Sequence, residues 1–298
     1  NSCCDSAPQV GLQPLNPLPV AGSCCGGEEQ SPKTEANKII PLGAMVQPPA
    51  PPVNNGRHQA GCMVCGGDLT YLAQGIRAQC FYCGGNKRTN AVCADGHYVC
   101  DDCHQEDGLS AIRLICAETA EKDMLTLLQK IRRHPAIPMH GPEHHAMVPG
   151  VILATYRNLG GPISREAILT GIERGSKVPG GVCGFWGNCG AAAGVGIAFS
   201  VILEATPLTA GSRQQAQMVT AQVLEKIAEV KGGRCCQRET VTALQEAAAI
   251  SARMLPVSLC ADDIVVCEQF AGNKECIRKQ CPLWDTENKG KFAHGDQA

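Results

Sequence analysis

Cysteine residues dominate the chemistry that this sequence offers. The 298 residues include 20 Cys, and from Gly61 to His104 they become regular, as three CxxC pairs with a further Cys between them. The two sulfurs of a CxxC pair can bind one tetrahedral ion, and two such pairs about fifteen residues apart are typical of structural zinc. This segment therefore offers ligands for one or two zinc ions, namely Cys62, Cys65, Cys80, Cys83, Cys93, His97, Cys100, Cys103 and His104.

The spacing leaves the pairing of these ligands open. Either the first two CxxC pairs share one ion and Cys93, Cys100 and Cys103 hold another with His97 or His104, or alternate pairs cross over between two sites. The Gly-Gly dipeptides after the first two pairs supply the tight turns that such sites need. The string from Cys100 to His104 also fits a c-type haem attachment motif, or a redox CxxC, but the neighbouring pairs already explain it as part of a zinc module.

A second group of candidate residues lies in the glycine-rich stretch from Gly180 to Gly196. It contains Cys183 and Cys189 and leads into an apolar run that ends before Pro207, which predicts a loop feeding the N-terminus of a buried helix. Unpaired backbone N–H groups at a helix start favour a substrate carboxylate or an anionic cluster. The alternative interpretation is a closely packed helix whose small residues let a neighbour approach.

Three histidines lie within six residues, at His140, His144 and His145, beside Glu143. The surrounding Pro and Gly residues predict a loop. Such a group can bind a metal, move protons or hold a carboxylate. We expect His144 or His145 to act as a catalytic base, with Glu143 orienting the imidazole or raising its pKa. The alternative is a polar surface turn.

The remaining cysteines lie in the last quarter of the chain. Cys235 and Cys236 precede a predicted helix, and Cys260, Cys267, Cys276 and Cys281 follow it, the last before Pro282. A Cys-Pro dipeptide at the end of a spaced cysteine set is common in iron–sulfur ligation. Arg238, beside the paired cysteines, is a candidate for holding a substrate carboxylate.

Composition limits the classes of function. With 44% hydrophobic and only 4% aromatic residues, the chain favours closely packed helices over a β-sandwich. A net charge of −2 excludes the basic field of a nucleic-acid-binding protein. No apolar run is long enough to cross a bilayer, and no export signal precedes the cysteines, so we expect a cytoplasmic protein that uses its thiols for metals and not for disulfides.

The predicted architecture is mainly α, with a small zinc-ribbon-like module. Amphipathic patterns and capping residues predict helices over Glu118–Arg133, Ile163–Gly175 and Ser212–Val230, and another up to Leu255. The predicted divisions are a disordered Cys/Pro-rich arm (1–58, with Cys3-Cys4 and Cys24-Cys25), a zinc module (59–108), a helical iron–sulfur domain (109–285) and a disordered tail (286–298).

From Gly141 to Leu255 the sequence resembles the iron–sulfur-dependent serine dehydratases and cysteine desulfidases. Gly141-Pro142-Glu143-His144-His145 is similar to their substrate-binding segment. Cys183 to Ala193 and Arg234 to Glu239 are similar to the two segments that supply cluster ligands. Glu143 and His144 stand where the family has serines, and the cysteines are doubled. The whole chain also resembles a cysteine-rich bacterial and archaeal domain found beside methyltransferase or radical-SAM proteins.

These resemblances imply a [4Fe-4S] cluster and two classes of function. The cluster ligands would come from Cys183, Cys189, Cys235, Cys236, Cys267, Cys276 and Cys281. With three ligands, an open iron would serve elimination of sulfide or water from a small thiol or hydroxy compound, or sulfur transfer. Alternatively, the chain is a non-enzymatic accessory that delivers sulfur or metal to a methyltransferase or radical-SAM partner, or docks on it. In a third interpretation it is a zinc-stapled helical scaffold.

Overall fold

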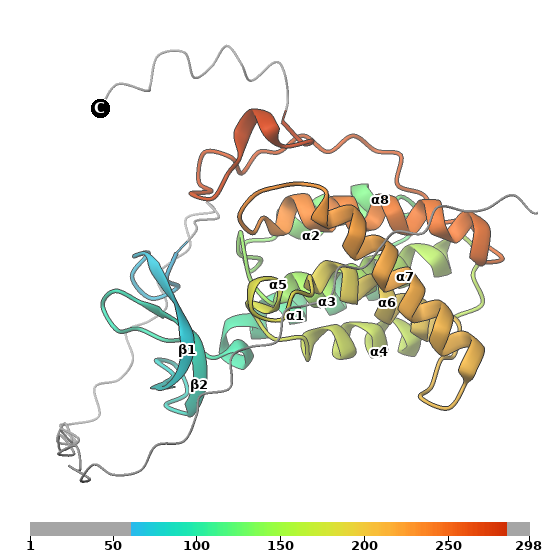
Figure 1. Ribbon diagram of the computed structural model, residues 1–298. Helices are drawn as coiled ribbons and strands as arrows, with labels where there is room; N and C mark the ends of the chain where they lie inside the picture. The colour runs from blue at the N-terminus through green and yellow to red at the C-terminus, as the bar shows by residue number, and fades with distance from the viewer. Residues whose placement is uncertain (1–60, 285–298) are drawn as a thin grey trace, which may run out of the picture. The chain divides into compact units, whose positions relative to one another are not determined.

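The computed structural model describes residues 61–284 (Figure 1). The predicted arm, with its two cysteine pairs, and the predicted tail lie outside the described residues. The described chain is mainly helical, with one small two-stranded sheet at its start, which confirms the predicted fold class. The elements are β1 (Leu69–Gln79), β2 (Asn86–Cys93), α1 (Asp101–Glu118), α2 (Met124–Arg132), α3 (Glu143–Asn158), α4 (Arg165–Ser176), α5 (Val182–Phe185), α6 (Gly190–Ile202), α7 (Ala210–Ala228), α8 (Cys236–Met254) and the 3-10 helix η1 (Arg278–Gln280).

Strands β1 and β2 form an antiparallel hairpin within what we term the hairpin module, residues 61–103. Each of its first two CxxC pairs closes a tight turn: Gly66 donates its N–H to the Cys62 carbonyl at 2.7 Å, and Gly84 donates to Cys80 at 2.9 Å. Both glycines have positive φ, 72° and 68°, a conformation that favours glycine. The predicted glycine turns are therefore present.

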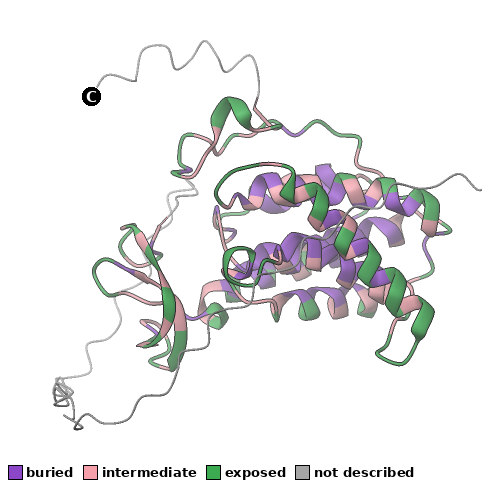
Figure 2. Cartoon of the chain, viewed as in Figure 1, coloured by how far each residue is buried: buried purple, intermediate pink, exposed green. Residues whose placement is uncertain are grey.

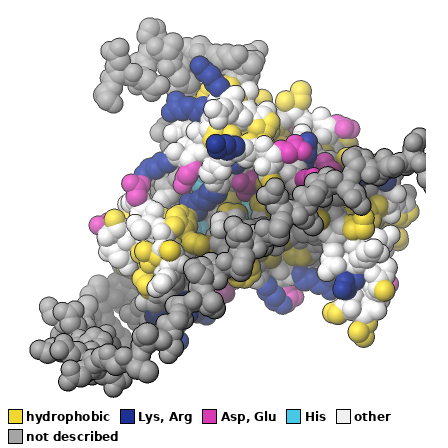
Figure 3. Space-filling model, in the orientation of Figure 1, with side chains coloured by type: hydrophobic (Ala, Val, Ile, Leu, Met, Phe, Trp, Pro, Cys, Tyr) yellow, Lys and Arg dark blue, Asp and Glu magenta, His cyan; other side chains and the backbone are white. Residues whose placement is uncertain are grey.

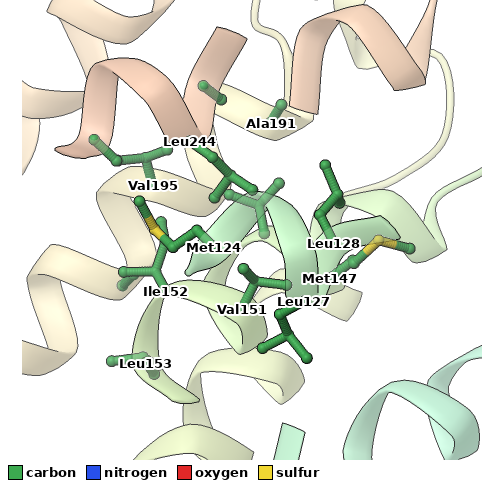
Figure 4. Packing of buried hydrophobic residues seen from close by; sticks show 14 of the residues in the cluster. Met124, Leu127, Leu128, Met147, Val151, Ile152, Leu153, Ala191, Val195 and Leu244 are labelled. Atoms are coloured by element: carbon green, nitrogen blue, oxygen red, sulfur yellow. The ribbon is translucent and has the colours of Figure 1, made fainter. Parts of the chain in front are cut away.

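Helix α3 lies at the centre of the helical part and packs against α1, α2, α4, α6 and α8. Buried residues line the facing sides of these helices, whereas the hairpin strands are largely exposed or half-buried (Figure 2). The core joins aliphatic side chains of α2 and α3 to smaller ones of α6 and to Leu244 of α8 (Figure 4). Small residues in α6 permit this close packing, since a Cβ on Gly194 would meet Val148 at 2.9 Å.

Several predicted helix boundaries need correction. The helix expected over Glu118–Arg133 begins at Met124, because the Asp123 carboxylate accepts hydrogen bonds from the backbone N–H groups of Leu125 and Thr126 and caps it there. Helix α7 begins at Ala210 with Thr209 as its cap, so the capping box predicted at Ser212 is wrong. The cap predicted at Ser164 is confirmed, as its side chain accepts from Ala167.

For the segment with three histidines, the structure differs more from the prediction. The predicted loop is in fact the start of α3, which continues through Pro149. Pro149 lies in the second turn of α3, where it has no N–H to donate to the carbonyl of His145, and the burial of most of the helix holds the segment helical. Glu143, His144 and His145 thus have fixed directions on a buried helix.

In the described ranges, no helix combines the length and apolar character that crossing a membrane requires.

Candidate functional site

Two groups of four side chains in the hairpin module could each hold a metal ion. In both, the candidate ligand atoms all lie within 4.8 Å of one another. The first quartet is Cys62, Cys65, Cys93 and His97, and the second quartet is Cys80, Cys83, Cys100 and Cys103. Alternate pairs therefore cross over, which selects one of the two pairings that the spacing left open.

The spacing within the quartets fits a tetrahedral ion. The sulfur atoms of Cys65 and Cys93 are 3.7 Å apart, and those of Cys83 and Cys100 are 3.8 Å apart. With Zn–S bonds of about 2.3 Å, tetrahedral geometry separates two sulfurs by about 3.8 Å. The chain thus brings these thiols to the separation that one shared ion requires.

Backbone donors prepare two of these thiols for metal binding. Although burial opposes it, hydrogen bonds from the backbone N–H groups of Cys100 and Cys83 help to lower the pKa of Cys80 to about 6. Burial also raises the pKa of Cys93, but hydrogen bonds from the backbone N–H groups of His97 and Asp95 help to lower that pKa to about 7. Since thiolate is the metal-binding form, these donors favour the ligand state near neutral pH.

His104, the alternative ligand to His97, lies outside both quartets. Its Nδ1 is 2.5 Å from Oε1 of the fully buried Glu143 on α3. Burial alone would lower the pKa of His104, but the Glu143 carboxylate outweighs it and raises that pKa. The sequence predicted that Glu143 orients His144 or His145, but in the structure Glu143 contacts His104. This contact joins the start of α1 to the start of α3.

The N-terminal ends of α3, α6 and α8 line part of a large cleft of about 2780 Å³, which extends to the hairpin module and α1. Among the reactive or charged side chains that line it around the starts of α6 and α8 are His145, Cys183, Cys189, Arg234, Cys236 and Glu239. The ring of His145 lies directly against Gly190, where any side chain would collide with it. Histidine, acidic and basic side chains are visible together in the hollowed region of the face in Figure 3.

The histidines of α3 have different surroundings. Both ring nitrogens of His144 are occupied, Nδ1 by Arg132 at 3.0 Å and Nε2 by the Pro138 carbonyl at 3.0 Å. Among the described residues His145 makes a hydrogen bond through Nδ1 alone, which donates to the Val178 carbonyl at 2.9 Å. Burial lowers the pKa of His145, so the ring is neutral near pH 7. Of the two predicted bases, His145 therefore has a ring nitrogen free for proton transfer and His144 does not.

A carboxylate lies among the thiols of the cleft. The Cys189 thiol donates to Oε2 of Glu239 at 3.4 Å, and the backbone N–H of Cys235 donates to Oε1 at 3.2 Å. Burial raises the pKa of Cys189, and Glu239 raises it further; the same two causes raise the pKa of Cys236 to about 12. Without a bound metal, both thiols are therefore protonated.

The seven predicted cluster cysteines fall into two places. Cys183, Cys189 and Cys236 line the cleft, whereas the C-terminal cysteines at 267, 276 and 281 are not among its lining residues. In the part of the chain that the structure describes, only the two quartets bring three or more ligand atoms within 4.8 Å. The seven cysteines thus do not form a preassembled site for a single ion.

Arg238, predicted to hold a carboxylate, is 4% exposed and donates to the Gly233 carbonyl at 2.9 Å and to Glu239 at 3.4 Å. Arg238 and Arg234 both line the cleft, and the guanidinium of Arg234 is 5.1 Å from the centre of the Tyr71 ring. Sequence reasoning missed Arg234 and Glu239 as site residues. The available signal was spacing, because residues three apart at a helix start share a face, as Cys236 and Glu239 do.

Acid should destabilise the chain through His140. Burial lowers its pKa to about 4, and Arg234 adds to the effect. In the unfolded chain His140 has a pKa near 6.5 and is protonated below that pH, whereas in the folded chain it stays neutral down to about pH 4. The free energy of unfolding therefore decreases as the pH falls below about 6.5. We expect this residue to cost about 2 kcal/mol between about pH 7.5 and pH 5.

Urea unfolding at the two pH values checks this expectation in wild type, in His140→Asn and in His134→Asn, an exposed control. The asparagine at 140 should lessen the pH dependence, whereas the control should not. An unchanged pH dependence in His140→Asn would contradict the assignment.

Comparison with known proteins identifies a family for this chain but assigns it no activity. The model of a family of unknown function (DUF5714) matches residues 112–284, which is more than half of the chain and spans the helical part to its last described residue. No curated protein and no solved structure matches the chain.

Proposed function

The chain belongs to this family of unknown function, and we propose that it is an iron–sulfur-dependent enzyme acting in the cleft. Its reaction is elimination of sulfide or water from a small thiol or hydroxy compound, or transfer of the sulfur. One observation carries the proposal: Cys189 and Cys236, from the starts of two different helices, line the same cleft as His145, whose Nε2 has no hydrogen-bond partner among the described residues.

The thiols that line the cleft are compatible with a cluster. Burial and the charge of Glu239 raise the pKa of Cys183, Cys189 and Cys236, so a cluster would bind these thiols with release of their protons. Ligands of a four-iron cluster bind separate iron atoms, so they need not approach one another as closely as the ligands of one ion. When bound through three thiols, the cluster would supply an open iron as a Lewis acid for a hydroxyl or thiol.

Other residues of the cleft supply the base and the carboxylate-binding groups that an elimination needs. His145, held in one tautomer by Val178, takes the substrate proton at Nε2, and the electron pair of the broken C–H bond forms the double bond as sulfide or hydroxide leaves. Arg234 and the N-terminal end of α6 line the cleft, and their positive charge suits a substrate carboxylate.

For the two quartets of the hairpin module we propose zinc, because their sulfur separations match those around one tetrahedral ion. Because each quartet joins two segments that are distant in sequence, each ion would hold the module in its folded form.

The test is metal and acid-labile sulfide content, with an absorption spectrum, on protein purified without oxygen. Small thiols and hydroxy acids are then screened for elimination. We expect Cys189→Ser and Cys236→Ser to lose iron and elimination activity, and Cys116→Ser, a buried core control, to keep both. Wild-type iron content in both cleft variants would show that the ligand assignment is wrong.

A non-enzymatic accessory role is the second candidate. It is favoured by the exposure of Cys183 beside Trp186, which is 67% exposed, since a partner could reach this thiol to receive sulfur or metal. A methyltransferase or radical-SAM protein would be that partner. Preparations that contain zinc but no iron, even when purified without oxygen, would support this role over the enzyme.

A further inference from the structure

We propose that Tyr71, on strand β1 of the hairpin module, is a positioning residue that orients the guanidinium of Arg234 for a substrate carboxylate. The hairpin module then forms one wall of the substrate site. This inference rests on the proposal that the cleft binds the substrate, and it adds the residue that sets the direction of the carboxylate contact.

Strand β1 carries Tyr71 to the cleft, where it is one of the lining residues. In the hairpin Tyr71 lies opposite Ala91, and the register shifts between Tyr71 and Ile76. The side-chain N–H of Asn90 donates to the Leu72 carbonyl at 2.9 Å and holds this irregular stretch. Such irregularities change the direction of side chains along a strand. Ile76, beyond the shift, is 43% exposed like Tyr71 but does not line the cleft.

The ring of Tyr71 contacts side chains from two other parts of the cleft. The guanidinium carbon of Arg234 lies over the ring, 5.1 Å from its centre. The ring of Phe185, in α5, is 6.3 Å away between centres and tilted by 45°. An aromatic face attracts a cation, and a guanidinium stacked on it keeps its planar N–H groups free at the edge. Tyr71 thus fixes the plane in which Arg234 offers its donors.

Other described residues do little to orient Arg234. Its ion pair with Glu275 joins Nη2 to Oε1 at 3.7 Å, which is longer than a hydrogen bond. Within the described chain its Nε is buried and has no hydrogen-bond partner. A guanidinium carries five N–H donors in one plane, and that plane matches the two oxygens of a carboxylate. The stacking on Tyr71 is therefore the contact that sets how a carboxylate can approach.

An ion pair in the C-terminal segment (residues 256–284) holds the two parts of this site together. Lys274 pairs with Asp68, the residue directly before β1, and the next residue, Glu275, approaches Arg234. The C-terminal segment thus contacts both the hairpin module and the residues that lead into α8. This connection keeps the ring of Tyr71 beside the guanidinium.

The test measures binding of propionate, a carboxylate without a leaving group, to the full chain by NMR titration. Tyr71→Leu should raise the dissociation constant about two- to fivefold, the usual effect of losing a cation–π contact. Tyr71→Phe keeps the ring and should bind like wild type, whereas Arg234→Gln should raise the constant at least about tenfold. Ile76→Ala is the matched control, from the same strand and equally exposed, and should bind like wild type.

A double-mutant cycle separates positioning from a general effect on the fold. Arg234→Gln leaves no cation for the ring to hold, so Tyr71→Leu should add little in that background. Equal effects of Tyr71→Leu in both backgrounds would show that the ring does not act through Arg234. That result would overturn the proposal, as would wild-type affinity in Tyr71→Leu or equally weak binding in Tyr71→Phe and Tyr71→Leu.

Kinetics on any compound that the elimination screen identifies give a second readout. Tyr71→Leu should raise KM by the same factor and leave kcat nearly unchanged, because the ring orients the carboxylate and does not touch the reacting atoms. Propionate binding needs no turnover. Weakened binding in Tyr71→Leu, with no elimination by wild type, would refute the proposed reaction and keep the carboxylate site. Elimination by wild type with unchanged propionate binding in Tyr71→Leu would do the reverse.

Discussion

Replacing Cys65 and Cys93 together with serine is expected to remove one zinc ion per chain and leave the second in place. The two sulfurs are 3.7 Å apart and belong to the first quartet, so both substitutions affect the same ion. If consecutive CxxC pairs shared an ion, the same variant would lose both. Structural zinc contributes about 10–16 kcal/mol to folding, so the loss should also expose the hairpin strands to protease.

The matched variant replaces Cys65 and Cys83. In the crossed pairing these cysteines belong to different quartets, so we expect this variant to lose both zinc ions. Metal analysis of the two double variants, with cobalt substitution to distinguish a four-sulfur site from a three-sulfur site with one histidine, decides the pairing. One retained zinc in Cys65→Ser/Cys83→Ser would contradict the crossed arrangement.

Substitution of His145 by asparagine is expected to lower kcat for elimination by about 10²- to 10⁴-fold, the usual contribution of a general base. Its Nδ1 donates to Val178 and its ring lines the cleft against Gly190, so only Nε2 is free to take a proton. KM should change little, because the proposed carboxylate contacts are to Arg234 and α6. Steady-state kinetics on whichever compound the screen identifies gives the measurement.

His144 provides the contrast, since it is adjacent in sequence and differs in surroundings. His144→Asn should lower the melting temperature because Arg132 loses one of its two side-chain partners, while kcat falls much less than in His145→Asn. If His144→Asn instead abolished activity at an unchanged melting temperature, the base would be His144 and the assignment from ring hydrogen bonds would be wrong.

The sequence alone determined the features that depend on local chemistry. The two glycine turns after Cys62-x-x-Cys65 and Cys80-x-x-Cys83 follow from the positive φ that glycine tolerates, and the cap at Ser164 follows from its side-chain oxygen. The helical fold class followed from composition and periodicity. The glycine turns and the helix cap depend on contacts within a few residues, so side-chain type and backbone preference are sufficient to predict them.

Only the tertiary structure decided which distant groups meet. Register opposes Leu69 to Cys93 in the hairpin, so the chain reversal returns Cys93 to the first CxxC pair and imposes the crossed quartets, which spacing could not reveal. Tertiary packing likewise made the histidine segment a helix and gave His144 and His145 different hydrogen-bond partners. The division of the C-terminal cysteines from the cleft arises in the same way, because a thiol's partners depend on the path of the chain in space and not on its neighbours in sequence.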